Sequence, residues 1–270
     1  MIPRPAILWI VMVCSVLAGG CASALREPSE VADLAGLPSD SGRAPEDLYR
    51  EASAVMESPA VTDEVDEARR LFLEAASLDV SCVNCLLGAS RALAWLVEHV
   101  EDGARRKALS IEGVDVGQLC VRDFPTAAEC RYRLALAVGQ QARERPSTAA
   151  DGLDVMVKLL EDLVAEAPDL DWAGPDRVLA LVLLRAPGWP AGPGDPESAL
   201  DHARAAVDRA PDYPPNQLVL GEALAENDQW EAGRSTYRRA VDLALDLEAG
   251  GNIEAASWRH EALDAIEALR

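Results

Sequence analysis

Aromatic residues are scarce in this sequence, and strand-like patterns are absent. Phe, Tyr and Trp make up only 4% of the 270 residues, whereas hydrophobic residues as a whole make up 49%. Alternating apolar and polar runs bounded by turn residues do not occur, and the helix formers Ala, Leu, Glu and Arg are abundant. The chain is long enough to bury a sizeable core. This composition favours an all-α fold over a β-sandwich or barrel.

Positive charge is also in short supply. The chain carries 25 basic against 46 acidic residues, which gives a formal net charge of −21. A protein this acidic is repelled by the phosphate backbone of nucleic acids and by anionic surfaces. We therefore expect no nucleic-acid partner.

Catalytic signatures are missing as well. The sequence has no HExxH, serine elbow, phosphate loop or dinucleotide fingerprint. Its three histidines, His99, His202 and His260, lie far apart along the chain. Because nothing places a nucleophile beside a base, we expect a binding protein rather than an enzyme, with no cofactor and no metal.

The N-terminus has the features of an export signal. Arg4 precedes an apolar run, 6–17, that is too short to span a bilayer comfortably. The following residues, Leu-Ala-Gly-Gly-Cys at 17–21, resemble a bacterial lipobox. This resemblance implies that residues 1–20 are a lipoprotein signal peptide and that Cys21 is lipidated. The alternative is ordinary cleavage after Ala24, which would leave a soluble secreted protein.

The residues after Cys21 give an expectation for where in the cell the protein is located. Ala22 is not acidic, and by resemblance to other lipoproteins this implies a protein anchored by lipid to the bacterial outer membrane and facing the periplasm. Residues 21–44 are rich in Pro, Gly, Ser and Asp, a composition typical of a flexible tether.

From residue 45 onward, helix patterns follow one another in pairs. Two antiparallel helices approach closely only where side chains are small, and bulkier residues fill the grooves beside each contact. Pro125, Pro168 and Pro211 are spaced 43 residues apart, each at a junction between units. The pattern resembles that of tetratricopeptide (TPR) repeats. The residues that carry this resemblance are Ala199, Ala203, Ala206, Pro211, Leu220, Gly221, Leu224, Gly233, Tyr237 and Ala240.

The resemblance implies an all-α, right-handed α-solenoid of divergent TPR-like helix pairs that fills residues 45–270. The pattern predicts helices at 45–57, 62–78, 82–100, 102–121, 127–143, 146–166 and 175–184, three helices between 196 and 247, and a capping helix at 253–269. Gly113 and Gly117 lie inside the 102–121 segment, and each internal glycine costs about 1 kcal/mol relative to Ala. We therefore expect that helix to be weak or broken.

Four cysteines lie in the repeat region. Cys82, Cys85, Cys120 and Cys130 all fall near helix ends that an antiparallel stack brings to one edge, so we expect their sulfur atoms to cluster. Such a cluster can form two disulfides or a zinc site, and the oxidising compartment of an exported protein favours disulfides. Cys82 can pair with Cys85 across one helical turn, but all three pairings remain open.

The loop 186–195 is a candidate contact site. It reads APGWPAGPGD, and a tryptophan held by prolines and glycines makes a good anchor for a partner or ligand. Equally, Trp189 can fold inward and plug the gap beside the short helix before it. Trp95 and Trp172 are expected to fill a groove or the core. The candidate contact residues are Trp189, Pro190, Gly192, Gly194 and Asp195.

Three stretches between 131 and 230 resemble the T-component of TRAP transporters, a family of periplasmic lipoproteins built from divergent TPR units. They are RYRLALAVGQQARER at 131–145, LLEDLVAEAPDLDWAGPDRVLA at 159–180 and GPGDPESALDHARAAVDRAPDY at 192–213. The resemblance implies an accessory, protein-binding role beside a periplasmic solute-binding protein, and a homo-oligomer such as a trimer with a channel for small hydrophobic ligands. The alternative is a general scaffold for cell-envelope assembly, and a third class is a zinc- or thiol-dependent enzyme.

Overall fold

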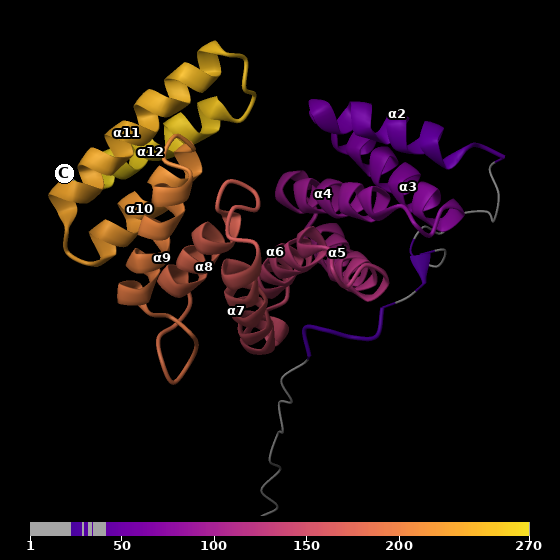
Figure 1. Cartoon of the computed structure of the whole chain (residues 1–270), viewed down its shortest axis with the longest axis horizontal. Coiled ribbons are helices and arrows are strands. Elements are labelled where there is room, and N and C mark those ends of the chain that lie inside the picture. Colours follow the sequence, from indigo (N-terminus) through magenta and orange to yellow (C-terminus); the bar gives the residue numbers. More distant parts are fainter. Residues whose placement is uncertain (1–22, 29, 32–33, 35–41, 270) are drawn as a thin grey trace, which may run out of the picture.

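The computed structural model of the chain describes residues 23–28, 30–31, 34 and 42–269 (Figure 1). The predicted signal peptide and Cys21 lie outside this part. Within it, every helix is too short or too polar to span a bilayer. The helices are α2 (Pro45–Glu57), α3 (Thr62–Leu78), α4 (Val83–His99), α5 (Gly103–Asp123), α6 (Ala128–Glu144), the short η1 (Pro146–Thr148), α7 (Ala149–Glu166), α8 (Gly174–Arg185), α9 (Pro196–Arg209), α10 (Pro214–Glu226), α11 (Trp230–Ala249) and α12 (Ala255–Ala268).

Consecutive helices pack side by side and build an α-solenoid. Five pairs, α2–α3, α4–α5, α6–α7, α8–α9 and α10–α11, follow in order, and α12 covers the end of the stack against α11 and α10. The predicted all-α solenoid of helix pairs with a C-terminal capping helix is confirmed. Proline starts α2, α9 and α10, where its missing N–H costs no helical hydrogen bond.

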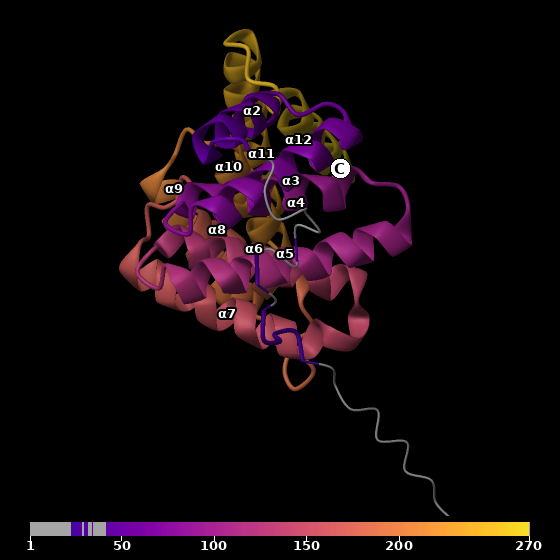
Figure 2. The same ribbon diagram turned by 90° about the vertical axis from the view of Figure 1, so that its right-hand side faces the viewer.

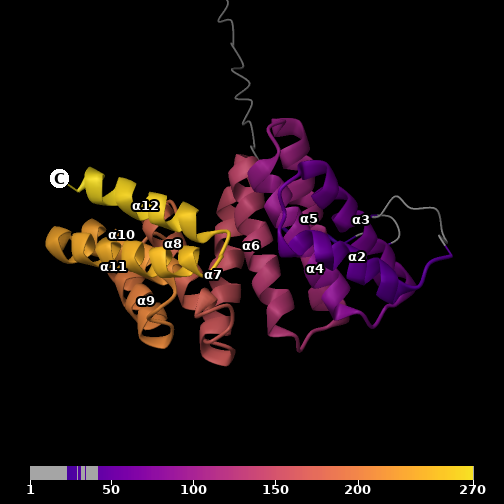
Figure 3. The same ribbon diagram turned by 90° about the horizontal axis from the view of Figure 1, so that it is seen from above.

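The solenoid has two halves that meet where α7 packs against α8. Seen from above, α2–α7 stand on one side and α8–α12 on the other (Figure 3). The view along the stack shows the first helices α2 and α4 above α6 (Figure 2). In the N-terminal half α4 contacts both α2 and α6, and in the C-terminal half α10 contacts both α8 and α12. The first helices of successive pairs therefore line a common surface in each half.

Glycine allows the closest approaches between helices. A Cβ added at Gly221 would lie 2.7 Å from the Tyr237 ring, and one added at Gly88 would lie 2.5 Å from the Phe72 ring. Both rings are almost fully buried and have little room to move. These contacts explain why the sequence places a small residue on one helix opposite a bulky residue on its partner helix.

We predict that Gly221→Ala lowers the free energy of unfolding by about 1–3 kcal/mol, because the added methyl group overpacks the contact with Tyr237. Urea unfolding followed by circular dichroism measures the change. Gly103→Ala is the matched control, since its Cβ would meet only the Arg106 side chain at 3.5 Å. An equal loss of stability in both variants would contradict the packing explanation.

The helix that the glycines were expected to weaken is intact. Helix α5 runs without interruption through Gly113 and Gly117. A Cβ at Gly117 would lie 3.0 Å from the Leu134 Cα atom, so the glycine lets α5 and α6 approach closely. Packing of buried residues across this contact offsets the low helix propensity of glycine.

The residues just after position 22 are packed against the domain, which corrects the expected flexible tether for this part of 21–44. Ala24 is 3% exposed and belongs to the core of the central helices. Its backbone N–H donates to the Asp151 carboxylate at 2.6 Å, and the Arg26 guanidinium pairs with buried Asp115. A composition rich in small and polar residues did not reveal that single side chains dock here.

The four cysteines form two pairs. The sulfur atoms of Cys82 and Cys85 lie at bonding distance, as do those of Cys120 and Cys130. The second bond joins the C-terminal end of α5 to the start of α6, as expected from helix ends that meet at one edge. Two disulfides are the outcome that the sequence favoured over a zinc site. Among the described residues there is no group of three or more Cys, His, Asp or Glu that could hold a metal ion.

We predict that removing the Cys120–Cys130 bond destabilises the protein more than removing the Cys82–Cys85 bond. Their sequence separations are 10 and 3 residues, so loop-closure entropy gives losses of roughly 3 and roughly 1.5 kcal/mol. Urea unfolding of the two paired Cys→Ala variants measures the order. The protein without substitutions can also be denatured in the absence of a reducing agent. Free thiols at these four positions would then contradict both bonds.

Candidate partner-binding groove

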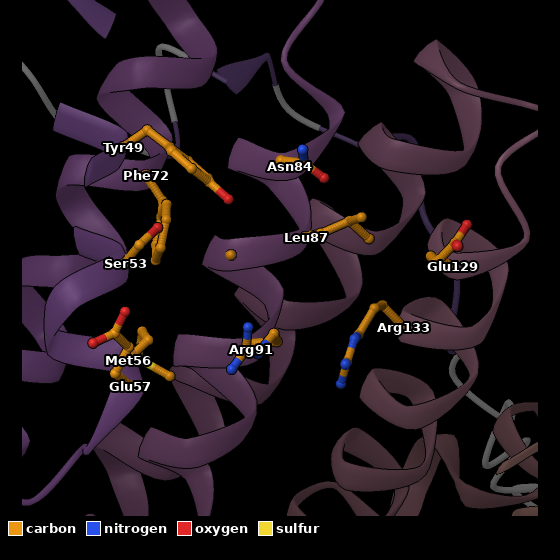
Figure 4. Close-up of a pocket in the computed structure, with 11 residues that line it drawn as sticks. Tyr49, Ser53, Met56, Glu57, Phe72, Asn84, Leu87, Arg91, Glu129 and Arg133 are labelled. Carbon is orange, nitrogen blue, oxygen red and sulfur yellow. The ribbon is translucent and has the colours of Figure 1, made fainter. Parts of the chain in front are cut away.

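The first helices of the N-terminal half line a groove of about 490 Å³ (Figure 4). Tyr49 and Ser53 come from α2, Asn84 and Arg91 from α4, and Arg133 from α6. We call it the arginine groove. It exists because α2, α4 and α6 are the first helices of successive pairs and therefore face the same side.

Two arginines in this groove form no ion pair with any carboxylate that the structure describes. Arg91 comes from α4 and Arg133 from α6, and both side chains line the groove (Figure 4). Within the described part of the chain neither forms an ion pair, although most other arginines there do, as Arg185 does with Glu222 at 2.7 Å. Glu57 and Glu129 also line the groove but do not pair with either guanidinium. Two neighbouring positive charges are thus left available in a strongly acidic protein.

The Arg133 guanidinium lies in an unfavourable environment. Burial lowers its pKa because few water molecules solvate the charge, and the nearby charge of Arg91 lowers the pKa further. Asp171 and Tyr132 act in the opposite direction but do not reverse the shift. An arginine stays protonated in proteins, so this cost is carried by the folded state. An anion bound against the Arg133 guanidinium would reduce this cost.

A second cavity, of about 430 Å³, lies at the C-terminal half and is lined by Trp172, Tyr213 and Trp258. We call it the aromatic groove. The Trp172 and Tyr213 rings lie nearly parallel with centroids 5.9 Å apart, and Trp258 meets Tyr213 edge-on at 5.5 Å. Trp172 is 65% exposed, so the expectation that it fills a groove or the core is corrected: it forms an open wall.

The turn that presents Trp172 has an unusual backbone. Asp171, Trp172 and Ala173 have φ values of 51°, 57° and 63°, three consecutive left-handed residues without a glycine. Such conformations cost free energy and persist only where the surroundings hold them.

A buried polar network holds this turn. The Arg177 guanidinium donates to the backbone oxygens of Asp171 and Trp172 at 3.0 and 3.1 Å and to the Asp171 carboxylate at 2.8 Å. Fully buried Asn216 donates to the Trp172 oxygen at 3.0 Å and accepts from Arg177 at 3.1 Å. The Tyr132 hydroxyl donates to Asp171 at 2.7 Å, and burial raises its pKa, so it remains protonated. The network joins α6, α8 and α10 where the two halves meet.

The predicted contact loop stands away from both grooves. Trp189 is 90% exposed, which overturns the inward-folded alternative, and its peptide bond to Pro190 is cis. The Gly194 N–H donates to the Pro187 oxygen at 2.9 Å, and a Cβ at Gly194 would lie 2.2 Å from the Ala186 oxygen. Asp195 caps α9 by accepting from the backbone N–H of Ser198 at 3.1 Å. Whether this loop binds a partner stays a prediction.

The remaining loop positions and the histidines have structural partners. A Cβ at Gly192 would lie 2.7 Å from the Pro187 oxygen, so a side chain there would collide with the backbone. His202 is not a simple surface residue, because its Nδ1 atom lies 2.8 Å from the buried Asp176 carboxylate. Trp95 is half-buried and stacks on His99 with centroids 3.8 Å apart.

Sequence reasoning missed both grooves. Arg91 did leave a signal, because none of the residues three or four positions away on its helix is acidic, so it has no partner along α4. Arg133 has Glu129 four positions before it and gave no such signal. The aromatic groove joins residues from two connections and from α12, and local sequence carries no trace of that.

The chain is similar in fold to solved structures of other proteins, at low sequence identity. No protein-family model matches the chain, and no curated protein matches it. The crystal structure of TTC0263, a thermophilic TPR protein in Thermus thermophilus, is similar with a TM-score of 0.60 and 16% identity, over 82% of this chain and 99% of that one. The MamA RS-1 ArsTM double mutant is similar with a TM-score of 0.50 and 18% identity, over 76% of this chain and 97% of that one. The chain therefore has a TPR-like fold.

Proposed function

We propose that this chain is a lipid-anchored, periplasm-facing protein that binds a partner protein in the arginine groove and serves as an accessory component of a TRAP-type solute uptake system. The proposed binding role rests on Arg91 and Arg133, which line the groove and form no ion pair within the described part of the chain. The TRAP assignment rests on the resemblance of residues 131–145, 159–180 and 192–213 to the T-component family.

The groove chemistry favours an anionic segment of the partner. Charge-assisted hydrogen bonds from arginine to carboxylate are among the strongest in proteins, and two adjacent guanidinium groups offer several donors. Tyr49, Ser53 and Asn84 on the same wall add neutral polar groups. An extended peptide with carboxylates fits this lining better than a cationic one, because it relieves the cost of the buried Arg133 charge.

The docked N-terminal residues support an anchor that holds the body near the membrane. Ala24 is fixed to α7 through Asp151, and an extended chain spans at most about 11 Å over the three residues back to Cys21. A lipid on Cys21 would therefore place the edge where α7 begins against the bilayer.

The test is crosslinking in intact cells, followed by detergent purification and mass spectrometry of the captured proteins. We expect a periplasmic solute-binding protein as the main partner and incorporation of labelled palmitate that Cys21→Ser abolishes. Capture dominated by outer-membrane assembly proteins would replace the uptake role with the scaffold alternative. Labelling that persists in Cys21→Ser would remove the proposed anchor without deciding the partner.

A further inference from the structure

We propose that the Trp189 loop of one copy of this protein docks into the aromatic groove of a second copy, so that the chains associate head to tail. The loop is Ala186–Gly194, and the groove is the cavity lined by Trp172, Tyr213 and Trp258. Both surfaces present exposed aromatic rings, Trp189 on the loop and Trp172 at the groove.

The loop is built to display its tryptophan. Hydrogen bonds close its base, from the Gly194 N–H to the Pro187 oxygen and from the Asp195 N–H to the Leu183 oxygen, both at 2.9 Å. Trp189 and Pro190 stand exposed beyond that base. A rigid display of a large ring lowers the entropy that must be lost on binding.

The groove is built to receive a ring. Trp172 stands open, held by the Arg177 network in a left-handed turn, and Trp258 forms a second wall across Tyr213. Aromatic rings prefer offset-stacked or edge-to-face neighbours with centroids 4.5–7 Å apart, and the two walls offer both. A cavity of about 430 Å³ lies in the size range of pockets that bind small ring systems.

The loop and the groove lie at opposite edges of the solenoid. The loop connects the two helices of one pair, α8 and α9, whereas Trp172 and Tyr213 lie in connections between successive pairs (Figure 1). In an antiparallel stack these two kinds of connection fall on opposite edges. The loop therefore does not reach the groove of its own chain, but it can reach that of a neighbour placed along the helix axes.

Charge selects a second copy at these surfaces. Two chains with a formal charge of −21 repel each other, so a contact between them is favoured where neither surface adds negative charge. Residues 186–194 contain no ionisable side chain. At the groove, Arg209 pairs with Asp169 at 3.3 Å, and Asp212 pairs with Arg239 at 2.8 Å, so the rim is internally neutralised.

A contact between two different surfaces of one chain is heterologous, and it extends into a ring or a filament. One tryptophan loop buries less area than a stable interface needs, so we expect a reversible association that grows with concentration. Because the contact joins two different surfaces, it can be distinguished from a symmetric interface by mixing variants that each lack one of the two surfaces.

The test uses sedimentation equilibrium of the full chain carrying Cys21→Ser, so that no acyl chain contributes, over a concentration series. Trp189→Ala removes the loop side chain and leaves the groove, whereas Trp172→Ala removes a groove wall and leaves the loop. We expect each to weaken self-association more than about tenfold. Trp230→Ala is the matched control, since Trp230 is 48% exposed and lies in neither surface. Far-ultraviolet circular dichroism confirms that all variants are folded.

Mixing the two variants is decisive. Each retains one half of the contact, so the mixture should form a one-to-one dimer and nothing larger, because no second pair of surfaces remains. A native chain that stays monomeric at every concentration would overturn the proposal. So would a Trp189→Ala variant that associates like the native chain, or a mixture that stays monomeric, and in those cases the loop serves another partner or a membrane surface.

Discussion

Replacing Arg91 and Arg133 together by methionine is expected to reduce binding of a tetraglutamate peptide by more than 100-fold. Each hydrogen bond between a guanidinium and a carboxylate contributes about 1.5–3 kcal/mol, and every 1.4 kcal/mol changes the dissociation constant tenfold. Methionine keeps the apolar stem of each side chain and removes the guanidinium with its charge and its N–H donors. Isothermal titration calorimetry at low salt measures the change, and rising salt should weaken binding to the native protein.

The matched control is Arg238→Met. Arg238 is exposed on α11, outside the arginine groove, and forms no ion pair within the described part of the chain. The Arg238→Met substitution removes one positive charge outside the groove, so binding of the peptide should change little. Equal weakening in Arg238→Met would mean that the peptide senses only net charge. Absence of binding to the native protein would contradict an anion site in the groove.

The same double variant should not lose stability. Burial of the Arg133 charge is unfavourable and outweighs its attraction to Asp171, and Arg91 adds repulsion. Removing both guanidinium groups should therefore leave the free energy of unfolding unchanged or raise it. Replacing a residue that the fold requires lowers the free energy of unfolding instead. Urea unfolding therefore separates a binding role from a structural one, and a loss of several kcal/mol would assign Arg91 and Arg133 to the fold instead.

The second large effect is expected at Arg177. Arg177→Met should lower the free energy of unfolding by about 3–5 kcal/mol, because it leaves the Asp171 carboxylate without its charged partner in a mostly buried site. It also removes the Arg177 donor from the backbone oxygens of Asp171 and Trp172. The left-handed turn at Asp171–Ala173 then lacks the contacts that hold it. Urea unfolding measures the loss.

Arg185→Met is the control for that experiment. Arg185 forms an ion pair with Glu222 at 2.7 Å, but its side chain is 59% exposed. Surface pairs of this kind contribute about 0–1 kcal/mol. Similar losses in the two variants would show that burial of the network around Arg177 does not matter, against the structural explanation.

Local rules explain how much of the fold was predictable from sequence. Proline at helix starts, small residues at helix contacts and regular spacing placed the boundaries of α2 and α3 at the observed residues and those of the other helices within a few positions. These signals act over one turn or one pair of helices, and a solenoid is built mainly from such short-range contacts. The same rules misjudged α5, because the benefit of Gly117 lies in its contact with Leu134 on another helix.

The sequence by itself therefore determined an all-α stack of helix pairs, a strongly acidic surface and cysteines able to pair in the repeat region. Only the tertiary structure decided where charge stays unpaired and where aromatic rings gather. Arg91 and Arg133 are 42 residues apart, and Trp172, Tyr213 and Trp258 come from two connections and a helix. The reason is physical: helix propensity and capping depend on near neighbours in the chain, whereas a groove forms where residues distant in sequence meet across packed helices.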